Sequence, residues 1–358
     1  MEFRLKTITP LWTGGIKKEA DKLHESGIIG NIRWWYETIV RGLGGYACDP
    51  THSSCNNKNH CISCELFGCT GWARKFRVEI KGEFVQEVRS KFGLTCLDST
   101  HRHRGWFVHK GLESNDFSIK LIPLKKINSD EEKILKFLFK VLIERAGFGA
   151  RNQLGYGIVD YLDEKERISL KIDNLPKFNN SNSPNFLPSI KNFFFCHNNV
   201  KTNRIEELLN IKCKLREAFR ISPLFSIRHL NQISHFRHFV LGAASAISMC
   251  PTCFGNIRSD YNDPNSYFCF WENKNFPRKE AIQMERMASK ISISRPFGFN
   301  NNFSIRIWGW LPSELPFNIS RKDVLNKIQQ VISCTNLIDL SDNIDFKSFL
   351  KNMGIKDA

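Results

Sequence analysis

The amino-acid sequence contains no long hydrophobic run. Its longest near-apolar stretch, Phe239 to Met249, includes Gly and Ser and is far shorter than the roughly 20 apolar residues of a membrane-spanning helix. Residues 1–8 alternate like a strand and lack the apolar segment of a secretory signal peptide. These absences argue against a membrane partner and against secretion, so we expect a cytoplasmic protein.

Acidic residues are scarce relative to basic ones. The 358 residues include 36 Asp and Glu against 52 Lys and Arg, which gives a formal net charge of +16. Such a charge says nothing about the fold, but it favours a polyanionic partner, and nucleic acid is the commonest one. A solvated basic surface is the simpler alternative. The chain is also long enough for two domains, and its 29 Phe allow a large core.

The sequence also lacks the His and Glu motifs of zinc proteases and nucleobase deaminases, yet five of its 12 cysteines lie between Cys48 and Cys69. Disulfides are rare in the cytoplasm, so metal binding explains this cluster better. The surrounding loop is rich in Asn, Ser and Thr and needs a tetrahedral thiolate site to become ordered. We therefore predict a structural zinc ion (Zn) with four ligands, Cys48, Cys55, Cys61 and Cys64.

Other ligands and a second metal site are alternatives. Cys69, His52 or His60 could replace one of the four cysteines, and reduced free thiols are the alternative to metal. Further along the chain, a Cys-x-x-Cys pair follows two histidines and could bind a second ion, although buried thiols and surface histidines need no metal. The four residues concerned are His235, His238, Cys250 and Cys253.

A helix is predicted from Gly27 to Arg41, because its apolar residues recur at helical spacing and form one buried stripe. That stripe consists of Ile32, Trp35, Tyr36, Ile39, Val40 and Leu43. Arg33, Glu37 and Arg41 fall on the other side with Trp34, which puts an aromatic ring between two guanidinium groups. Bases stack on such rings and phosphates pair with guanidinium forks. The alternative is that a neighbouring element covers Trp34.

The first 165 residues follow the order strand, helix, strands, helix, strand, which is that of a ferredoxin-like, RRM-like βαββαβ unit. A capping box at Ser129 to Glu132 predicts the second helix. The loop from Gly147 to Gly157 carries four glycines around Arg151, as expected where a backbone approaches an extended anion; a helix cap followed by a turn would explain only some of these glycines. The expected strands are 2–9, 76–80, 84–88, 106–109, 117–124 and 158–162, and the helices are 27–41 and 130–146.

An Asn-rich stretch within 174–189 predicts a linker to a second, more divergent α+β unit. We therefore predict an α+β protein with two ferredoxin-like domains, 1–173 and 190–358, and a Cys-rich zinc-loop insertion at 46–70 in the first. The elements expected in the second are strands at 193–195, 290–294 and 303–310 and helices at 204–219, at 235–249, from Arg321 and from Asp345.

Several motifs together resemble the RAMP superfamily and, more narrowly, the family of subunit one of the Cmr effector complex of type III-B CRISPR systems. The resemblance is specific over residues 1–160 and weaker beyond. Its motifs are Thr9-Pro-Leu-Trp-Thr-Gly-Gly15, Gly30-Asn-Ile-Arg-Trp-Trp-Tyr-Glu37, Arg41-Gly-Leu-Gly-Gly45, Cys64-Glu-Leu-Phe-Gly-Cys-Thr-Gly-Trp-Ala-Arg-Lys-Phe-Arg77 and the Gly147 to Gly157 loop.

This resemblance implies an RNA-binding, antiviral subunit that holds the 3′ part of a guide RNA. It also implies that the protein helps to capture complementary target RNA among other Cmr subunits and is not itself the nuclease. The partners are then guide (CRISPR) RNA, target RNA and the other subunits of the complex. The residues expected to contact RNA are Trp12, Lys17, Asn31, Arg33, Trp34, Arg41, Arg74, Lys75, Arg77, Gly149, Arg151, Asn152, Gly155 and Tyr156.

The main alternative is an enzyme, a metal-independent endoribonuclease that processes guide RNA on the same fold. It would need a histidine general acid or base beside basic residues. The segment His101-Arg-His-Arg104 supplies these residue types, and His24 lies in an exposed segment. The same arginines would equally suit phosphate binding. A zinc-stabilised DNA-binding protein is a weaker alternative, because neither helix-turn-helix nor finger spacing is present.

Overall fold

The computed structural model describes the chain in segments, which fall into two compact units. The first unit comprises Met1–Ser90, His109–Phe195 and Ile338–Ala358, and the second comprises Lys91–Val108 and Cys196–Leu337. The domain boundaries predicted from the sequence stay a prediction. The described residues are 1–15, 19–49, 55–86, 94–97, 103–106, 111–152, 155–170, 175–179, 187–201, 291–294, 297–299, 302–311, 321–332, 336–341 and 343–353.

Some predictions lie outside the described residues. They include the expected helices at 204–219 and 235–249 and the second metal site. Among the candidate site residues and their alternatives, Lys17, His52 and His101 lie there too.

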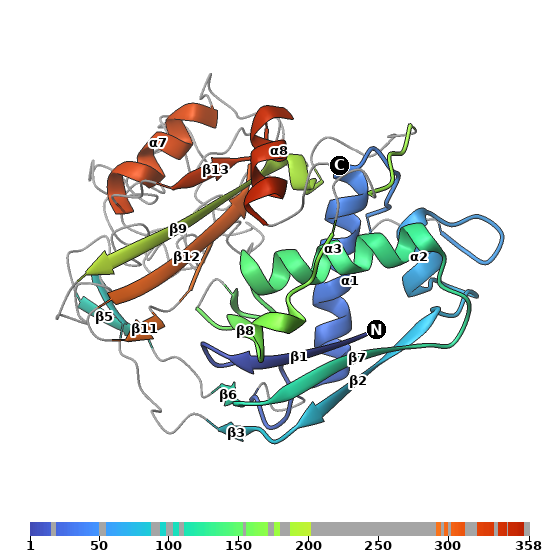
Figure 1. Cartoon of the computed structure of the whole chain (residues 1–358), viewed down its shortest axis with the longest axis horizontal. Coiled ribbons are helices and arrows are strands. Elements are labelled where there is room, and N and C mark those ends of the chain that lie inside the picture. The colour runs from blue at the N-terminus through green and yellow to red at the C-terminus, as the bar shows by residue number, and fades with distance from the viewer. Residues whose placement is uncertain are drawn as a thin grey trace, which may run out of the picture. The chain divides into compact units, whose positions relative to one another are not determined.

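A four-stranded antiparallel sheet forms the base of the first unit (Figure 1). Its strands run in the order β2-β7-β1-β8, with Phe3 opposite Ile119 and Leu5 opposite Tyr161. Side chains alternate along β1, so Phe3 and Leu5 are buried while Glu2 and Arg4 are exposed. The strands are β1 (Glu2–Thr7), β2 (Phe76–Gly82), β7 (Phe117–Pro123) and β8 (Val159–Tyr161).

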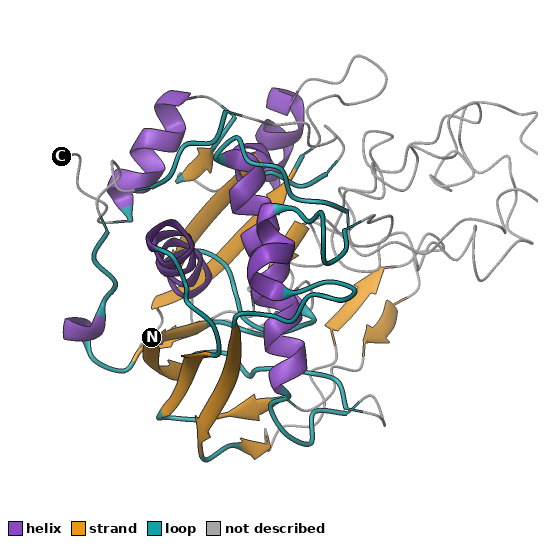
Figure 2. Ribbon diagram, turned by 90° about the vertical axis from the view of Figure 1, so that its right-hand side faces the viewer, coloured by secondary structure: helices purple, strands orange, loops and turns teal. Residues whose placement is uncertain are grey.

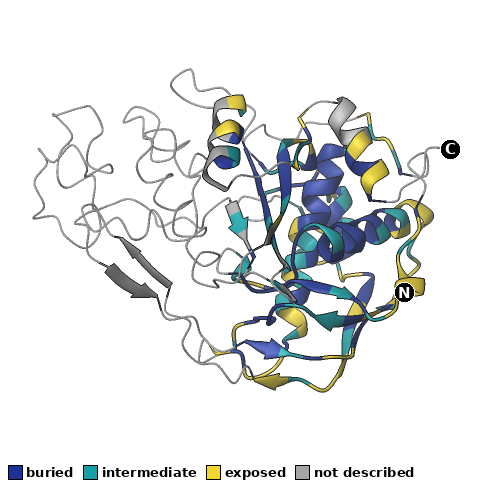
Figure 3. Cartoon of the chain, turned by 60° about the vertical axis from the view of Figure 1, so that its left-hand side comes forward, coloured by how far each residue is buried: buried dark blue, intermediate teal, exposed yellow. Residues whose placement is uncertain are grey.

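Two helices, α1 (Glu25–Gly42) and α3 (Ser129–Glu144), cover the buried face of this sheet (Figure 2). The ring of Phe139 in α3 stacks on Phe3 at 4.0 Å. Both helices are largely buried (Figure 3), and α1 buries the predicted apolar stripe except for Leu43, which is half-buried. Strand, helix, two main strands, helix and strand thus follow one another as predicted.

The start of α3 differs by one residue from the prediction. Asn128, not Ser129, is the N-cap, and its side chain accepts a hydrogen bond from the backbone N–H of Glu131, whose carboxylate accepts one from the N–H of Asn128. Both Asn-x-x-Glu and Ser-x-x-Glu fit a capping box, since Asn and Ser cap equally well. The buried Glu131 also pairs with Lys75, which favours the Asn128 register.

Short elements complete the first half. β3 (Val85–Gln86) pairs with β6 (Leu112–Glu113), and β4 (Leu94–Leu97) pairs with β5 (His103–Trp106). Residues 164–166 form a single helical turn. The helix α2 (Ile62–Phe67) was not predicted. It begins at Cys61, whose sulfur accepts a hydrogen bond from the N–H of Cys64.

A five-stranded sheet is formed later in the chain, with the order β10-β12-β9-β13 and β11 paired to β12. The helices α7 and α8 begin close to the predicted positions. Among the described residues, no helix is both long and apolar enough to cross a bilayer. The elements are a turn at Ile190–Asn192, β9 (Phe193–Lys201), β10 (Ile291–Ile293), β11 (Phe297–Phe299), β12 (Asn302–Trp310), α7 (Arg321–Ile332), β13 (Leu337–Asp339) and α8 (Asn343–Asn352).

Candidate nucleic-acid interface and metal site

The glycine-rich loop between α3 and β8 packs against the segment that follows β1. The N–H of Ala150 donates to the carbonyl of Trp12 at 2.9 Å, and the N–H of Gly157 donates to the carbonyl of Pro10 at 2.9 Å. Gly149 has φ +75°, and a Cβ there would lie 2.7 Å from the Trp12 carbonyl oxygen. Only glycine combines this conformation with so close an approach.

Arg151 lies at the tip of this loop in the left-handed conformation, with φ 57°. In the described part of the chain it is the only residue other than glycine with positive φ, a conformation that costs about 1–2 kcal/mol. Its guanidinium lies 3.7 Å from the centroid of the Trp12 ring. No other described residue forms a hydrogen bond or an ion pair with it. The fold thus holds a charged group in a strained position, and none of the acidic residues that the structure describes pairs with it.

The start of α1 contacts the segment that carries Trp12. The hydroxyl of Thr13 accepts a hydrogen bond from the N–H of His24 and donates one to the carbonyl of Lys22. Gly27 packs on Thr13, since a Cβ on Gly27 would lie 2.9 Å from the Thr13 methyl. Three segments distant in sequence therefore meet around Trp12 and Thr13. They are residues 10–15, residues 24–27 at the start of α1, and the described residues of the glycine-rich loop, 147–152 and 155–157.

Two buried polar atoms here have no hydrogen-bond partner in the part of the chain that the structure describes. The indole N–H of Trp12 and the side-chain oxygen of Asn31 are buried and have no hydrogen-bond partner within the described segments. Gly30 is exposed on α1, and a Cβ there would meet nothing within 4 Å. Packing within the protein therefore does not require glycine at this position.

The remaining predicted residues of the loop shape it from within. The side-chain amide of Asn152 donates to the carbonyls of Phe148 and Tyr156, both at 3.1 Å. Tyr156 is fully buried, and Gly155 has φ +95°. These three residues hold the loop that carries Arg151.

Three charged side chains of α1, those of Arg33, Glu37 and Arg41, are used within the protein rather than left to solvent. Glu37 is buried, and its carboxylate lies 2.9 Å from Nε of Arg33 and 3.7 Å from Nη2 of Arg41. Arg41 donates to the carbonyls of Ala47, Cys48 and Pro188. The expected exposed face of two guanidinium groups is therefore not observed. Arg33 has acceptors in Glu37, Gly68 and Cys64, and Arg41 has them in the loop that follows α1 and at Pro188.

Trp34 keeps part of the expected exposure. The residue is 37% exposed, and its ring meets those of Trp35 and Phe193 edge-on, at 5.3 and 5.9 Å. The covering element considered from the sequence is present, but it leaves one part of the ring open.

The three basic residues before and within β2 also differ in their exposure to solvent. Arg74 and Arg77 are exposed, whereas Lys75 is buried and its ammonium lies 2.6 Å from Glu65 and 2.8 Å from Glu131. Lys75 thus links the segment from Cys48 to Cys69, here called the cysteine segment, to α3. Of these three basic residues, only the two arginines place their charge at the surface.

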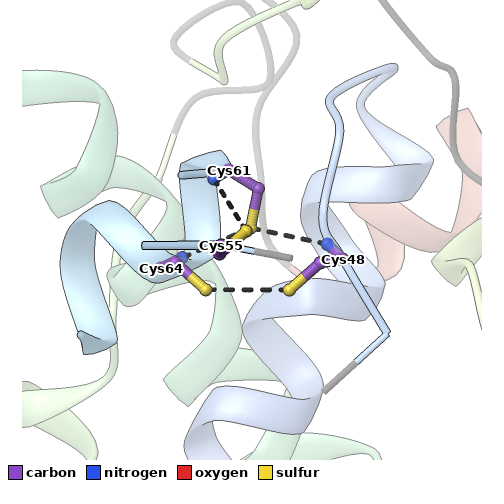
Figure 4. Close-up of side chains that lie close together, drawn as sticks. All are labelled: Cys48, Cys55, Cys61 and Cys64. Carbon is purple, nitrogen blue, oxygen red and sulfur yellow. Dashed lines mark hydrogen bonds between the residues drawn. The ribbon is translucent and has the colours of Figure 1, made fainter. Parts of the chain in front are cut away.

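The four predicted metal ligands converge (Figure 4). The sulfur atoms of Cys48, Cys55, Cys61 and Cys64 all lie within 4.8 Å of one another, so they could bind a single metal ion. Three of the four are buried and Cys55 is half-buried. Cys69 packs against the cluster from outside. The prediction that these cysteines gather is confirmed.

Hydrogen bonds to sulfur surround this cluster. The N–H groups of Cys48 and Cys64 both donate to the sulfur of Cys61, and the N–H of Cys61 donates to that of Cys55. The Cys48 and Cys64 side chains lower the pKa of Cys61, as do their backbone N–H groups. His60 faces Asn56 and Glu65 instead of the sulfurs.

The fold and the site define a class: an α+β protein with antiparallel sheets, a four-cysteine cluster and a glycine-rich loop that carries Arg151. Residues 4–160 match the family model of the RAMP superfamily. This match covers the region that carries the motifs and confirms their resemblance to the superfamily. No curated protein matches the chain.

Solved structures of Cmr proteins are similar to this chain at low identity. Cmr1 from Pyrococcus furiosus in its apo form is 13% identical, with 93% of this chain and 95% of that one covered and a TM-score of 0.44. A type III-B Cmr-beta complex bound to cognate target RNA and AMPPnP contains a chain that is 12% identical, with coverages of 93% and 98% and a TM-score of 0.46. Scores below 0.5 do not establish a shared fold, so they add nothing to the family match.

Proposed function

We propose that this protein is an RNA-binding subunit of a type III-B CRISPR (Cmr) ribonucleoprotein effector complex. It holds the 3′ part of the guide RNA and helps to capture complementary target RNA. The RAMP superfamily match over residues 4–160 and the net charge of +16 support this proposal. The observation that carries it is Arg151, held in a strained conformation over Trp12 with no carboxylate of the described residues bound to it.

The chemistry of this junction suits a nucleic-acid backbone. A guanidinium without an acidic partner binds phosphate as a fork, and glycines let a backbone approach the strand closely. Flat rings accept bases by stacking. The side chains that we propose to contact RNA are Trp12, Lys17, Asn31, Trp34, Arg74, Arg77 and Arg151, with Gly149 at the backbone.

The four cysteines are proposed to bind structural zinc. Four thiolates in one cluster are typical of a zinc site, and N–H groups that donate to sulfur are the usual outer partners of such ligands. A bound ion would hold the segment from Cys48 to Cys64 against α1. We further propose that β9 to α8 belong to a second ferredoxin-like domain, which the five-stranded sheet and two helices support.

The protein is proposed to hold RNA without cleaving it. One observation favours the endoribonuclease alternative: Nε2 of His24 lies 2.9 Å from the carboxylate of Asp21, at the start of α1 beside the proposed interface. Such a pair could move a proton from a 2′-hydroxyl. This possibility is tested together with His101.

The test combines binding and cleavage in the same samples. Anisotropy of a labelled single-stranded RNA is measured with the full chain over a salt series, and the RNA is then run on a denaturing gel. We expect salt-sensitive binding and intact RNA, with His24→Ala and His101→Ala unchanged on the gel. If the wild type cleaves the RNA at discrete positions and either variant abolishes this cleavage, the endoribonuclease alternative is correct. If the wild type does not bind RNA, the proposed RNA-binding function is refuted.

A further inference from the structure

Each of the three nitrogen atoms of the Arg33 guanidinium donates a hydrogen bond within the protein. Nε donates to Glu37 at 2.9 Å, Nη1 donates to the carbonyl of Gly68 at 3.1 Å, and Nη2 donates to the sulfur of Cys64 at 3.3 Å. The side chain is 26% exposed. An arginine guanidinium stays charged in a protein at neutral pH.

The contact between Arg33 and Cys64 places a positive charge beside the proposed metal site. Four thiolates around a divalent zinc ion leave a net charge of −2 in a site that is mostly buried. Buried charge is costly unless a partner compensates for it. Among the described residues, Arg33 is the only basic side chain that donates to one of the four sulfur atoms, and Glu37 holds the guanidinium in place.

The same side chain spans the cysteine segment. Cys64 lies inside α2, and Gly68 is the residue at which α2 ends. Gly68 has φ +86°, and a Cβ there would lie within 3 Å of backbone atoms of Trp72 and Arg74. Arg33 therefore fixes both a ligand and the turn after it to α1, while Arg41 fixes the carbonyl of Cys48 at 2.7 Å.

We propose that Arg33 is a positioning residue of the metal site and not a phosphate ligand. It holds the Cys64 sulfur toward the ion, offsets the thiolate charge and ties the metal-bearing segment to the helix whose first turns form the RNA interface. This inference rests on the proposed zinc site. It replaces the sequence-based prediction that Arg33 contacts RNA.

The test measures zinc retention separately from RNA binding. Zinc-loaded full-length protein is mixed with a chromophoric chelator, and the release rate is compared for wild type, Arg33→Lys and Arg33→Gln. The control is Arg4→Gln, which removes an arginine whose guanidinium also lies 2.9 Å from a carboxylate, that of Asp116. RNA affinity is then measured over a salt series with zinc in excess.

We expect release to become about 10–100-fold faster in Arg33→Gln, as for other outer partners of metal ligands. Arg33→Lys should lie between this variant and wild type, because lysine keeps the charge without the fork, and Arg4→Gln should match wild type. The salt slope of RNA binding should be unchanged in both Arg33 variants.

Unchanged zinc release in Arg33→Gln would overturn the inference, and so would a salt slope reduced by one phosphate contact in the same variant, which loses the charge. A wild-type protein that retains no zinc would refute the metal site itself. Should Arg33→Gln fail to fold, Arg33→Lys decides, since a release rate equal to that of wild type contradicts the positioning role.

Discussion

Arginine side chains have opposite environments at the two ends of the surface around α1, at the cysteine segment and at the glycine-rich loop. Arg33 and Arg41 lie beside the cysteine segment. Their guanidinium groups donate hydrogen bonds there to carbonyl groups, a carboxylate and a sulfur atom. Arg151, on the glycine-rich loop, has an aromatic ring beneath it and no acceptor among the described residues. The number of arginines near a site therefore says less about ligand binding than the protein acceptors that surround each one.

The largest change is expected at the cysteine end. Cys61→Ser removes the sulfur that accepts hydrogen bonds from Cys48 and Cys64. Zinc should fall from near one equivalent per chain to near zero by elemental analysis, and the free energy of unfolding should fall by about 4 kcal/mol, since loss of a metal is among the most destabilising changes. Cys69→Ser is the matched control and should keep the metal. Metal-free wild type of full stability would contradict the site.

At the exposed ring, Trp34→Ala should weaken single-stranded RNA binding by about 1–3 kcal/mol, because one stacking platform is removed. Trp34→Phe keeps a ring over Phe193 and should weaken binding less. Fluorescence anisotropy gives the affinities, and thermal melting measures how much stability the protein owes to the packing of Trp34 on Trp35 and Phe193. Equal affinity and equal melting temperature in Trp34→Ala and wild type would remove Trp34 from the interface.

On the glycine-rich loop, Arg151→Ala should weaken RNA binding by roughly 1 kcal/mol or more and lower the salt slope by about 0.7, the value for one phosphate contact on a single strand. Stability should change little, since the cation–π contact with Trp12 is the only one that its guanidinium makes to the described part of the chain. Affinities at several salt concentrations provide the slope. A slope equal to that of wild type would exclude a phosphate contact.

The smallest expected change comes from a variant of Gly30, which tests whether RNA backbone approaches α1 closely. Gly30→Ala should raise the free energy of unfolding by about 0.5–1 kcal/mol, because alanine is the better helix former and a Cβ meets nothing there. If RNA backbone approaches this turn, the same variant should bind RNA less tightly. A variant that is more stable and binds equally well would show that Gly30 does not face RNA.

Much of the first unit could be predicted because it rests on local patterns. The apolar stripe of α1 and the βαββαβ order follow from hydrophobic spacing, and the four-cysteine cluster follows from composition. The glycine-rich loop follows from glycines that helix ends and simple turns do not require. The six-residue α2 was missed, since one and a half turns carry no periodic signal and its N-cap is Cys61.

The environments of Arg33, Arg41 and Lys75 could not be predicted. Helical spacing tells which side chains share a face, but not which distant segment covers that face. Here Cys48, Gly68 and Pro188 cover the charged face of α1, and they come from 7 to 147 residues away along the chain. Arg151 shows the converse, because nothing in its local sequence indicates that Trp12 would lie beneath it.

The most direct test compares Arg33→Lys with Arg151→Lys, in zinc-saturated protein, by zinc release and by the salt dependence of RNA affinity. Both variants keep their charge and lose the guanidinium fork, so they differ only in what that fork contacts. We predict faster zinc release with unchanged RNA affinity for Arg33→Lys, and weaker RNA binding with unchanged zinc release for Arg151→Lys. The reverse pattern, or the same response in both variants, would contradict the division of roles between the two ends.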